Sequence, residues 1–269
     1  MARDSALRVA WFTTGRGPGS FGALKYVLDA IDGGLPVEIA VIFVNRDRGE
    51  SEATDQLIAM AESRGLPVEA SSSVGFRKAR GGRTGKPGEP LQPWRYEYDL
   101  ATAETMMKYE FEIGVMFGYM LIATEELFGR FTFINDHPAL PDGPIGTYQE
   151  VIAELIRSQA LESGCMMNVV TGDVDRGPAL SFCRFPIRDD MNEAAWEAIS
   201  GSAVDAASLE DLTAIPLYAD IRARGVARER PFLVETLRAI AGGELQVPPP
   251  SPLDLTDAVE RAVGSTTRL

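Results

Sequence analysis

The chain has 269 residues, 45% of them hydrophobic and 24% charged, and these proportions are usual for a soluble globular protein with a sizeable core. A formal net charge of −13 argues against a surface that binds nucleic acid nonspecifically. No apolar run approaches the roughly 20 residues of a membrane-spanning helix, and the first residues lack the apolar stretch of a signal peptide, so we expect a cytoplasmic protein that does not bind membranes.

Apolar runs typical of buried strands alternate with segments of helical periodicity over residues 7–185. Strands are predicted at 7–13, 37–44, 67–70, 113–119, 131–135, 165–171 and 180–185. Helices are predicted at 21–31, 51–64, 98–109, 124–128 and 148–163. Parallel strands joined by helical crossovers produce this rhythm, so the sequence predicts an α/β fold with a Rossmann-like, doubly wound and mostly parallel sheet.

After Pro186 the sequence predicts helices only, at 192–199, 209–223 and 231–240. A proline-rich break at 247–252 follows, and 254–263 is then either a last helix or part of a mobile tail. We therefore expect an α/β domain over 1–186, a helical C-terminal extension over 187–245 that packs on it, and a tail over 246–269.

The cysteines and the histidine limit the metal chemistry. Cys165 and Cys183 both lie in predicted strands, where buried, reduced thiols are expected. Two separated cysteines and a single histidine make no zinc pattern, so no metal is expected.

The segment over residues 71–95 is basic in an otherwise acidic chain. It contains one acid, Glu89, against six cations, which are Arg77, Lys78, Arg80, Arg83, Lys86 and Arg95. Its glycines and prolines exclude a long helix or strand. It is a solvated loop or a flap that covers an anionic ligand, and the local concentration of positive charge favours the flap.

A glycine-rich turn follows the first predicted strand and opens a helix. Backbone amides and the helix dipole make such a turn an anion site, where Gly17 and Gly19 let the backbone approach the ligand and Ser20 adds a hydroxyl. Gly17-x-Gly19-x-x-Gly22 also matches the dinucleotide-binding pattern formally. Arg46, after the second strand, could hold a 2′-phosphate, so an NADP-binding oxidoreductase or a noncatalytic nucleotide-binding module stays open.

The only histidine follows the fifth predicted strand, in Asn135-Asp136-His137-Pro138. The carboxyl end of a strand in an open α/β sheet faces the crevice where such folds bind ligands. A charged imidazole and the Asn135 amide could both donate hydrogen bonds to a developing oxyanion there. Asp175, in the turn after the next strand, could orient the ring and take a proton. The alternative is a turn histidine that satisfies the backbone near Pro138.

These motifs resemble those of the folate-dependent formyltransferases, and among them the glycinamide ribonucleotide formyltransferases. In chain order, the family's Gly-x-Gly-Ser, Ser-Arg-Glu-x-Tyr-Asp, Ala-Gly-Phe-Met, Asn-x-His-Pro and Asp-Gly-Gly-Pro motifs are matched at 17–20, 94–99, 116–120, 135–138 and 175–178. The resemblance extends from residue 7 to residue 185, and more weakly to residue 245. The set of Asn135, His137 and Asp175 is its most specific part.

The resemblance implies an enzyme that transfers a formyl group from 10-formyltetrahydrofolate, its co-substrate, to a primary amine, with glycinamide ribonucleotide of purine biosynthesis the favoured acceptor. It implies that Asn135 and His137 stabilise a tetrahedral oxyanion, while Asp175 keeps the imidazole charged and helps to remove the amine proton. It places the acceptor's phosphate on Gly17, Gly19, Ser20 and Arg95. It places the folate on backbone groups of Met120, Leu121, Ile122, Thr171, Gly172 and Asp173.

Two departures from the family concern the acceptor. The family's Ser-Leu-Leu-Pro is shortened to Ala139-Leu140-Pro141, and the Asn after the loop serine is Phe21. An amino sugar or an amino acid is therefore an alternative acceptor. A formyltetrahydrofolate deformylase would use the same three residues, but such enzymes usually carry an N-terminal regulatory domain, which we do not expect here. The initiator-tRNA formyltransferases end in a β-barrel domain, which the predicted helices after Pro186 do not resemble. We expect the protein to bind small molecules and not nucleic acid. Its oligomeric state is open between a monomer and a homodimer.

Overall fold

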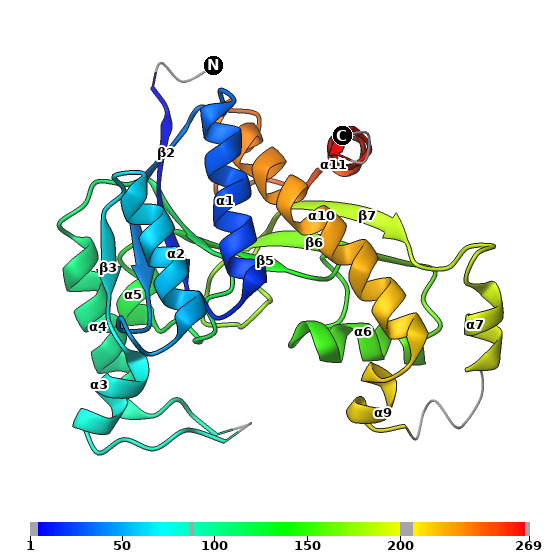
Figure 1. The fold of residues 1–269 in the computed structure, drawn as a ribbon, viewed down its shortest axis with the longest axis horizontal. Coiled ribbons are helices and arrows are strands. Elements are labelled where there is room, and N and C mark those ends of the chain that lie inside the picture. The colour runs from blue at the N-terminus through cyan, green and yellow to red at the C-terminus, as the bar shows by residue number, and fades with distance from the viewer. Residues whose placement is uncertain (1–4, 87–88, 200–206, 267–269) are drawn as a thin grey trace. The chain divides into compact units, whose positions relative to one another are not determined.

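The computed structural model describes residues 5–86, 89–199 and 207–266 (Figure 1). Over these residues eight strands form one mostly parallel sheet, which confirms the predicted fold class. The strands are β1 (Leu7–Thr13), β2 (Val37–Val44), β3 (Val68–Ala70), β4 (Ile113–Met116), β5 (Phe133–His137), β6 (Glu162–Val169), β7 (Ala179–Pro186) and β8 (Leu253–Asp254). The helices are α1 (Pro18–Asp32), α2 (Glu52–Ser63), α3 (Ser73–Ala79), α4 (Pro93–Met106), α5 (Glu125–Phe128), α6 (Tyr148–Arg157), α7 (Glu193–Ala198), α9 (Leu209–Thr213), α10 (Pro216–Ala241) and α11 (Thr256–Thr266). None of these helices is long and apolar enough to cross a membrane.

Contacts within the chain divide it into two compact units. The first consists of Met1–Asn135, Val169–Gly177 and Ile240–Glu244. The second consists of Asp136–Asn168, Pro178–Ala239 and Leu245–Leu269. Three elements, β5, β6 and α10, therefore contribute residues to both units. The domain boundaries expected after residues 186 and 245 stay predictions.

The strands of the first unit lie in the order β3-β2-β1-β4-β5, and each neighbouring pair is parallel. β2 and β3 extend the sheet on one side of β1, and β4 and β5 then extend it on the other side. The direction of winding therefore reverses between β1 and β4. Right-handed crossovers then put α1 and α2 on one face and α3, α4 and α5 on the other, and the helices of each group pack together (Figure 1). Open α/β sheets bind their ligands outside the carboxyl ends of the strands at such a reversal.

The core of the first unit fixes those strand ends. β1 and β2 are almost continuous apolar runs because helices cover both faces of the sheet, and Arg8 is the one residue of β1 that is not fully buried. The ring of Phe12 packs 5.0 Å from that of Phe43 and, edge-on, 4.8 Å from that of Phe133. Full burial of such a side chain stabilises the fold by about 1.5–3 kcal/mol. The polar turns that follow the carboxyl ends of these strands are therefore attached to a tightly packed core.

In the second unit β6 and β7 are antiparallel, and β8 pairs with β7 in parallel. Cys165 directly faces Cys183 across the β6–β7 pair, and both are buried and free, which confirms the predicted reduced thiols. The hydrogen bond to Cys183 and burial raise the pKa of Cys165 well above its usual value. Cys165 therefore stays a protonated, unreactive thiol at neutral pH.

The region after Pro186 differs from its prediction in two ways. Two helices were expected at 209–223 and 231–240, but α10 runs without interruption over Pro216–Ala241, with Pro231 inside it. Pro231 removes one helical hydrogen bond, and the complete burial of Phe232 and Leu233 beside it offsets that loss. The expectation of helices only is also wrong, because β8 adds a short strand to β7 before α11 begins.

Candidate functional site

The glycine turn after β1 enters α1 without a side-chain cap. Gly17 is the N-cap, with an extended backbone, and no side chain bonds to the amides of the first turn. A Cβ atom on Gly17 or Gly19 would meet no described atom within 4 Å, so the space above the turn is open. The first amides of a helix have no acceptor within it, and together with the helix dipole they favour an anion here.

Gly118 lets the segment after β4 approach this turn. Its φ is +66°, and a Cβ atom there would lie 2.6 Å from the Ser20 hydroxyl oxygen. The amide of Thr14 donates to the Gly118 carbonyl at 3.0 Å, and the Thr14 hydroxyl accepts from the amide of Met120 at 3.0 Å. The segment over residues 117–124, called the 117–124 segment below, is thereby attached to the end of β1.

Arg95 attaches the other end of the 117–124 segment. Its Nη2 donates to Asp99 Oδ1 at 3.0 Å and to the carbonyl of Ile122 at 2.7 Å, and Asp99 Oδ2 accepts from the amide of Thr124 at 2.6 Å. The side chains of Arg95 and Asp99 are only 5% and 0% exposed. Arg95, predicted as a phosphate ligand, is thus buried and engaged with the protein's own main chain.

The outer side of the 117–124 segment is apolar. Met120 and Ile122 are 62% and 47% exposed, and Leu121 is half-buried. These are the three residues whose backbone was predicted to bind the folate. A piece of main chain outside helix and strand, with apolar side chains beside it, is suited to a flat heterocycle that has hydrogen-bonding groups along its edge.

The second predicted folate segment, residues 171–173, lies in a turn over residues 171–177 that contains hydrogen bonds of its own. The Thr171 hydroxyl accepts from the amide of Asp173 at 3.3 Å, and the amide of Arg176 donates to the carbonyl of Asp173 at 3.0 Å. Asp175 has a φ of +56°, a left-handed conformation that costs most residues energy. Gly177 packs so tightly that a Cβ atom would lie 1.7 Å from the carbonyl oxygen of Val169. We call residues 171–177 the 171–177 turn; in it Gly172 and Asp173 are exposed.

The end of β5 carries the two predicted oxyanion donors. Asn135 is half-buried and pairs in register with Met116 of β4, whereas His137 is 3% exposed. His137 Nε2 lies 2.9 Å from the carbonyl of Pro144, so Nε2 carries a proton and donates it. Asn135 and Asp175 belong to the first unit and His137 to the second, so the convergence of the three side chains is a proposal.

Asp136 is a feature that the sequence analysis did not single out. Successive residues of a strand point to opposite faces, so Asp136 faces away from Asn135 and His137. Its Oδ1 is buried and has no hydrogen-bond partner among the described residues. Burial, followed by the charge of Glu229, raises the pKa of Asp136 well above its usual value, while Arg222 lowers it. A carboxyl between two polar residues at the end of an apolar strand was the signal that could have revealed it.

The basic segment before Arg95 is folded, and its arginines have partners. Arg80 pairs with Glu97 at 2.7 Å, and Arg83 pairs with Glu89 at 2.7 Å. Trp94 donates through Nε1 to the carbonyl of Arg83 at 3.0 Å. Residues 87–88 of this segment lie outside the described residues, and its role as a flap stays a prediction.

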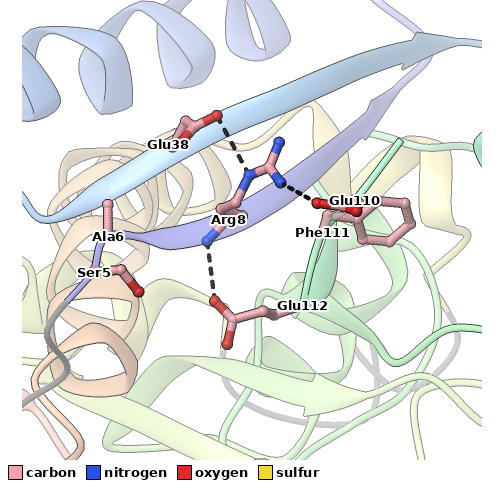
Figure 2. A pocket seen from close by; sticks show the side chains of 7 residues that line it. All are labelled: Ser5, Ala6, Arg8, Glu38, Glu110, Phe111 and Glu112. Carbon is pink, nitrogen blue, oxygen red and sulfur yellow. Dashed lines mark hydrogen bonds and ion pairs between the residues drawn. The ribbon is translucent and has the colours of Figure 1, made fainter. Parts of the chain in front are cut away.

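A cavity of about 360 Å³ opens near the amino ends of the strands in the first unit (Figure 2). Arg8 lies between Glu38 and Glu110, at 3.4 Å and 3.2 Å, and its backbone amide donates to Glu112 at 3.2 Å (Figure 2). The strands are parallel, so this is the edge of the sheet opposite the turns described above. These exposed charges contribute little to stability.

Among the described residues, no cluster of His, Cys, Asp and Glu could hold a metal ion.

Comparison with solved structures finds the same fold. Glycinamide ribonucleotide transformylase 1 from Symbiobacterium toebii aligns with a TM-score of 0.62 and 20% identity over 90% of each chain. Phosphoribosylglycinamide formyltransferase from Coxiella burnetii aligns with a TM-score of 0.61 and 18% identity over 89% of each chain. The chain has the phosphoribosylglycinamide formyltransferase fold.

The enzyme from Bacillus halodurans gives the same result at 19% identity and a TM-score of 0.57, over 87% of this chain and 94% of that one. Neither the family models nor the sequences of curated proteins match the chain. At these identities the likeness concerns the fold, and a fold by itself does not determine an activity.

Proposed function

We propose that the protein transfers a formyl group from 10-formyltetrahydrofolate to a primary amine. The observation that supports this proposal is the sequence Asn135-x-His137-Pro138 at the end of β5, in a chain with the phosphoribosylglycinamide formyltransferase fold. No protein nucleophile is required, because the amine attacks the formyl carbon directly. The chain needs to hold two small molecules together and to stabilise the charge that forms between them.

The chemistry proceeds through a tetrahedral intermediate. The amine lone pair forms the new C–N bond while the formyl C=O electron pair moves to oxygen. Asn135 donates to that oxyanion through its amide, and His137 in its charged form donates through Nδ1–H, since Nε2–H is engaged with Pro144. Asp175 stabilises the imidazolium and accepts the amine proton, directly or through water. Collapse of the intermediate expels N10 of tetrahydrofolate, which leaves with a proton.

The 117–124 segment and the 171–177 turn would bind the folate. Both lie in the first unit and follow strands, β4 and β6. Backbone groups of Met120, Leu121 and Ile122 would pair with the edge of the pterin, and their apolar side chains would cover its faces. Thr171, Gly172 and Asp173 would contribute further backbone groups.

The proposed acceptor is glycinamide ribonucleotide. Its phosphate would bind the open first turn of α1 at Gly17, Gly19 and Ser20, where no side chain of the described residues caps the helix. An amino sugar or an amino acid is the alternative acceptor, and Phe21 in place of the family's Asn supports it. A homodimer stays a separate prediction, to be tested by sedimentation.

The test is formation of tetrahydrofolate from 10-formyltetrahydrofolate and each candidate amine. With the right amine, His137→Ala should lower kcat by about 100–1000-fold, because one oxyanion donor is lost. Asp142→Asn, an exposed acid five residues away in sequence, is the control and should keep the wild-type rate. A wild-type protein that binds no folate, or a His137→Ala variant with full activity, would contradict the proposal.

A further inference from the structure

The first turns of α4 contain a buried ion pair, Arg95 and Asp99. Arg95 and Asp99 are one helical turn apart and almost completely buried. Removing two charges from water is costly even when they pair, and apolar residues of similar volume are often at least as stabilising. Stability alone therefore does not explain why charged residues occupy these two positions.

The pair binds main chain as well as itself. Arg95 holds the carbonyl of Ile122 at 2.7 Å, and Asp99 holds the amide of Thr124 at 2.6 Å. These two groups lie on either side of Ala123, which is 7% exposed. At the other end, the Thr14 hydroxyl holds the amide of Met120. The stretch between these attachments contains Leu121 and Ile122, for whose amides no hydrogen bond is found among the described residues.

The position of Arg95 is itself fixed. Its guanidinium lies 5.2 Å from the centre of the Trp94 ring and 5.5 Å from that of Tyr98. The Tyr98 hydroxyl donates to the carbonyl of Ser71 at 2.6 Å, which holds that ring in place. Both bonds come from Nη2, whose two hydrogens point in fixed directions in the guanidinium plane, whereas the ammonium of a lysine turns freely at the end of a flexible stem.

We propose that Arg95 and Asp99 are positioning residues, which hold the 117–124 segment in the conformation that binds the pterin ring of the folate. This inference rests on the proposed formyltransferase function. A segment ordered in advance loses little conformational freedom when the ligand binds, so its backbone donors contribute to affinity in full. Arg95 then acts through the main chain and not as a ligand of the acceptor's phosphate.

The decisive variant removes both charges at once. Arg95→Met/Asp99→Leu keeps the volume of the pair and leaves no unpaired buried charge, but it leaves the Ile122 carbonyl and the Thr124 amide without these partners, so its melting temperature should fall by only a few degrees. Titration calorimetry with tetrahydrofolate should show at least about a tenfold loss of affinity, since the attachments of Ile122 and Thr124 are gone. In steady-state assays KM for 10-formyltetrahydrofolate should rise in the same proportion, while KM for the acceptor amine stays unchanged.

Two further variants separate positioning from general destabilisation. Tyr109→Phe removes a hydrogen bond to Glu69 in the same unit, outside the 117–124 segment, and should not change folate affinity at all. Arg95→Lys keeps the charge without the planar guanidinium and should lose affinity by several-fold, which tests the inference even if the double variant does not fold. A folded Arg95 variant with wild-type folate affinity would overturn the inference, whereas a wild-type protein that ignores tetrahydrofolate would overturn the proposed function itself.

Discussion

The 117–124 segment and the 171–177 turn lie in the same unit, and both belong to the proposed folate site, but their described hydrogen bonds differ. Buried side chains from β1 and α4 fasten the first, through Thr14, Arg95 and Asp99. The second contains hydrogen bonds from the amides of Asp173 and Arg176, and it carries a residue with a left-handed backbone, Asp175. We infer that the two have different roles. The 117–124 segment provides a rigid surface for binding, and the 171–177 turn holds the carboxylate of Asp175 in an unusual conformation.

The largest effect that would sharpen this contrast is expected at Asp175. Asp175→Gly should lower kcat by about 100-fold or more, because the proposed proton acceptor is lost. The same change should raise the free energy of unfolding by up to about 1 kcal/mol, since glycine adopts a φ of +56° without strain. Chemical denaturation and steady-state kinetics measure the two. Parallel loss of stability and activity would mean that Asp175 has a structural role only.

The next effect concerns the packing of the 171–177 turn. Gly177→Ala should lower the free energy of unfolding by about 2–3 kcal/mol, because the new methyl group would lie 1.7 Å from a main-chain oxygen that cannot easily move. Gly172→Ala is the matched control in the same turn, where the nearest described atom is 3.9 Å away, and it should change stability by less than about 0.5 kcal/mol. Equal losses in both variants would show that the turn tolerates no side chain anywhere.

The smallest effect is a dependence of stability on pH that originates in the fastening of the 117–124 segment. Burial raises the pKa of Asp99, and Arg95 and the bond from Thr124 oppose the rise. An acid whose pKa is raised in the folded state binds its proton more tightly there, so its stabilising contribution is present below the usual pKa of aspartate and declines as pH increases towards the folded value.

Denaturation from acid to neutral pH should therefore show the wild type losing stability relative to Arg95→Met/Asp99→Leu as pH rises, by at most about 1.4 kcal/mol per pH unit. The opposite slope would mean that Arg95 more than compensates for burial, and that Asp99 is held as a carboxylate at all pH values above its ordinary range.

The sequence predicted the fold well because its signals are local. Apolar runs such as that of β1 end at glycines, and their alternation with helical periods leaves few arrangements of the sheet. The predicted break between two helices before residue 231 was wrong, because tertiary packing outweighed a local rule. Pro231 normally ends a helix, yet the burial of Phe232 and Leu233 carries α10 past it.

The candidate site could be predicted only in part. Motif order identified Asn135, His137 and Asp175, but their mutual geometry depends on elements far apart in sequence. Arg95 was predicted to bind the acceptor's phosphate, because its burial is invisible in the sequence. Asp99, four residues later on the same face of a helix, was the available indication that Arg95 had a partner inside the protein.

The pair Cys165 and Cys183 provides a reporter that needs no engineering. They are the only two cysteines of the chain, and both lie buried on facing strands of the second unit. A thiol reagent can therefore react only when those strands separate, and the kinetics of its labelling would record how often that unit opens. Measured with and without substrates, that rate would reveal whether ligands that bind the first unit also steady the second.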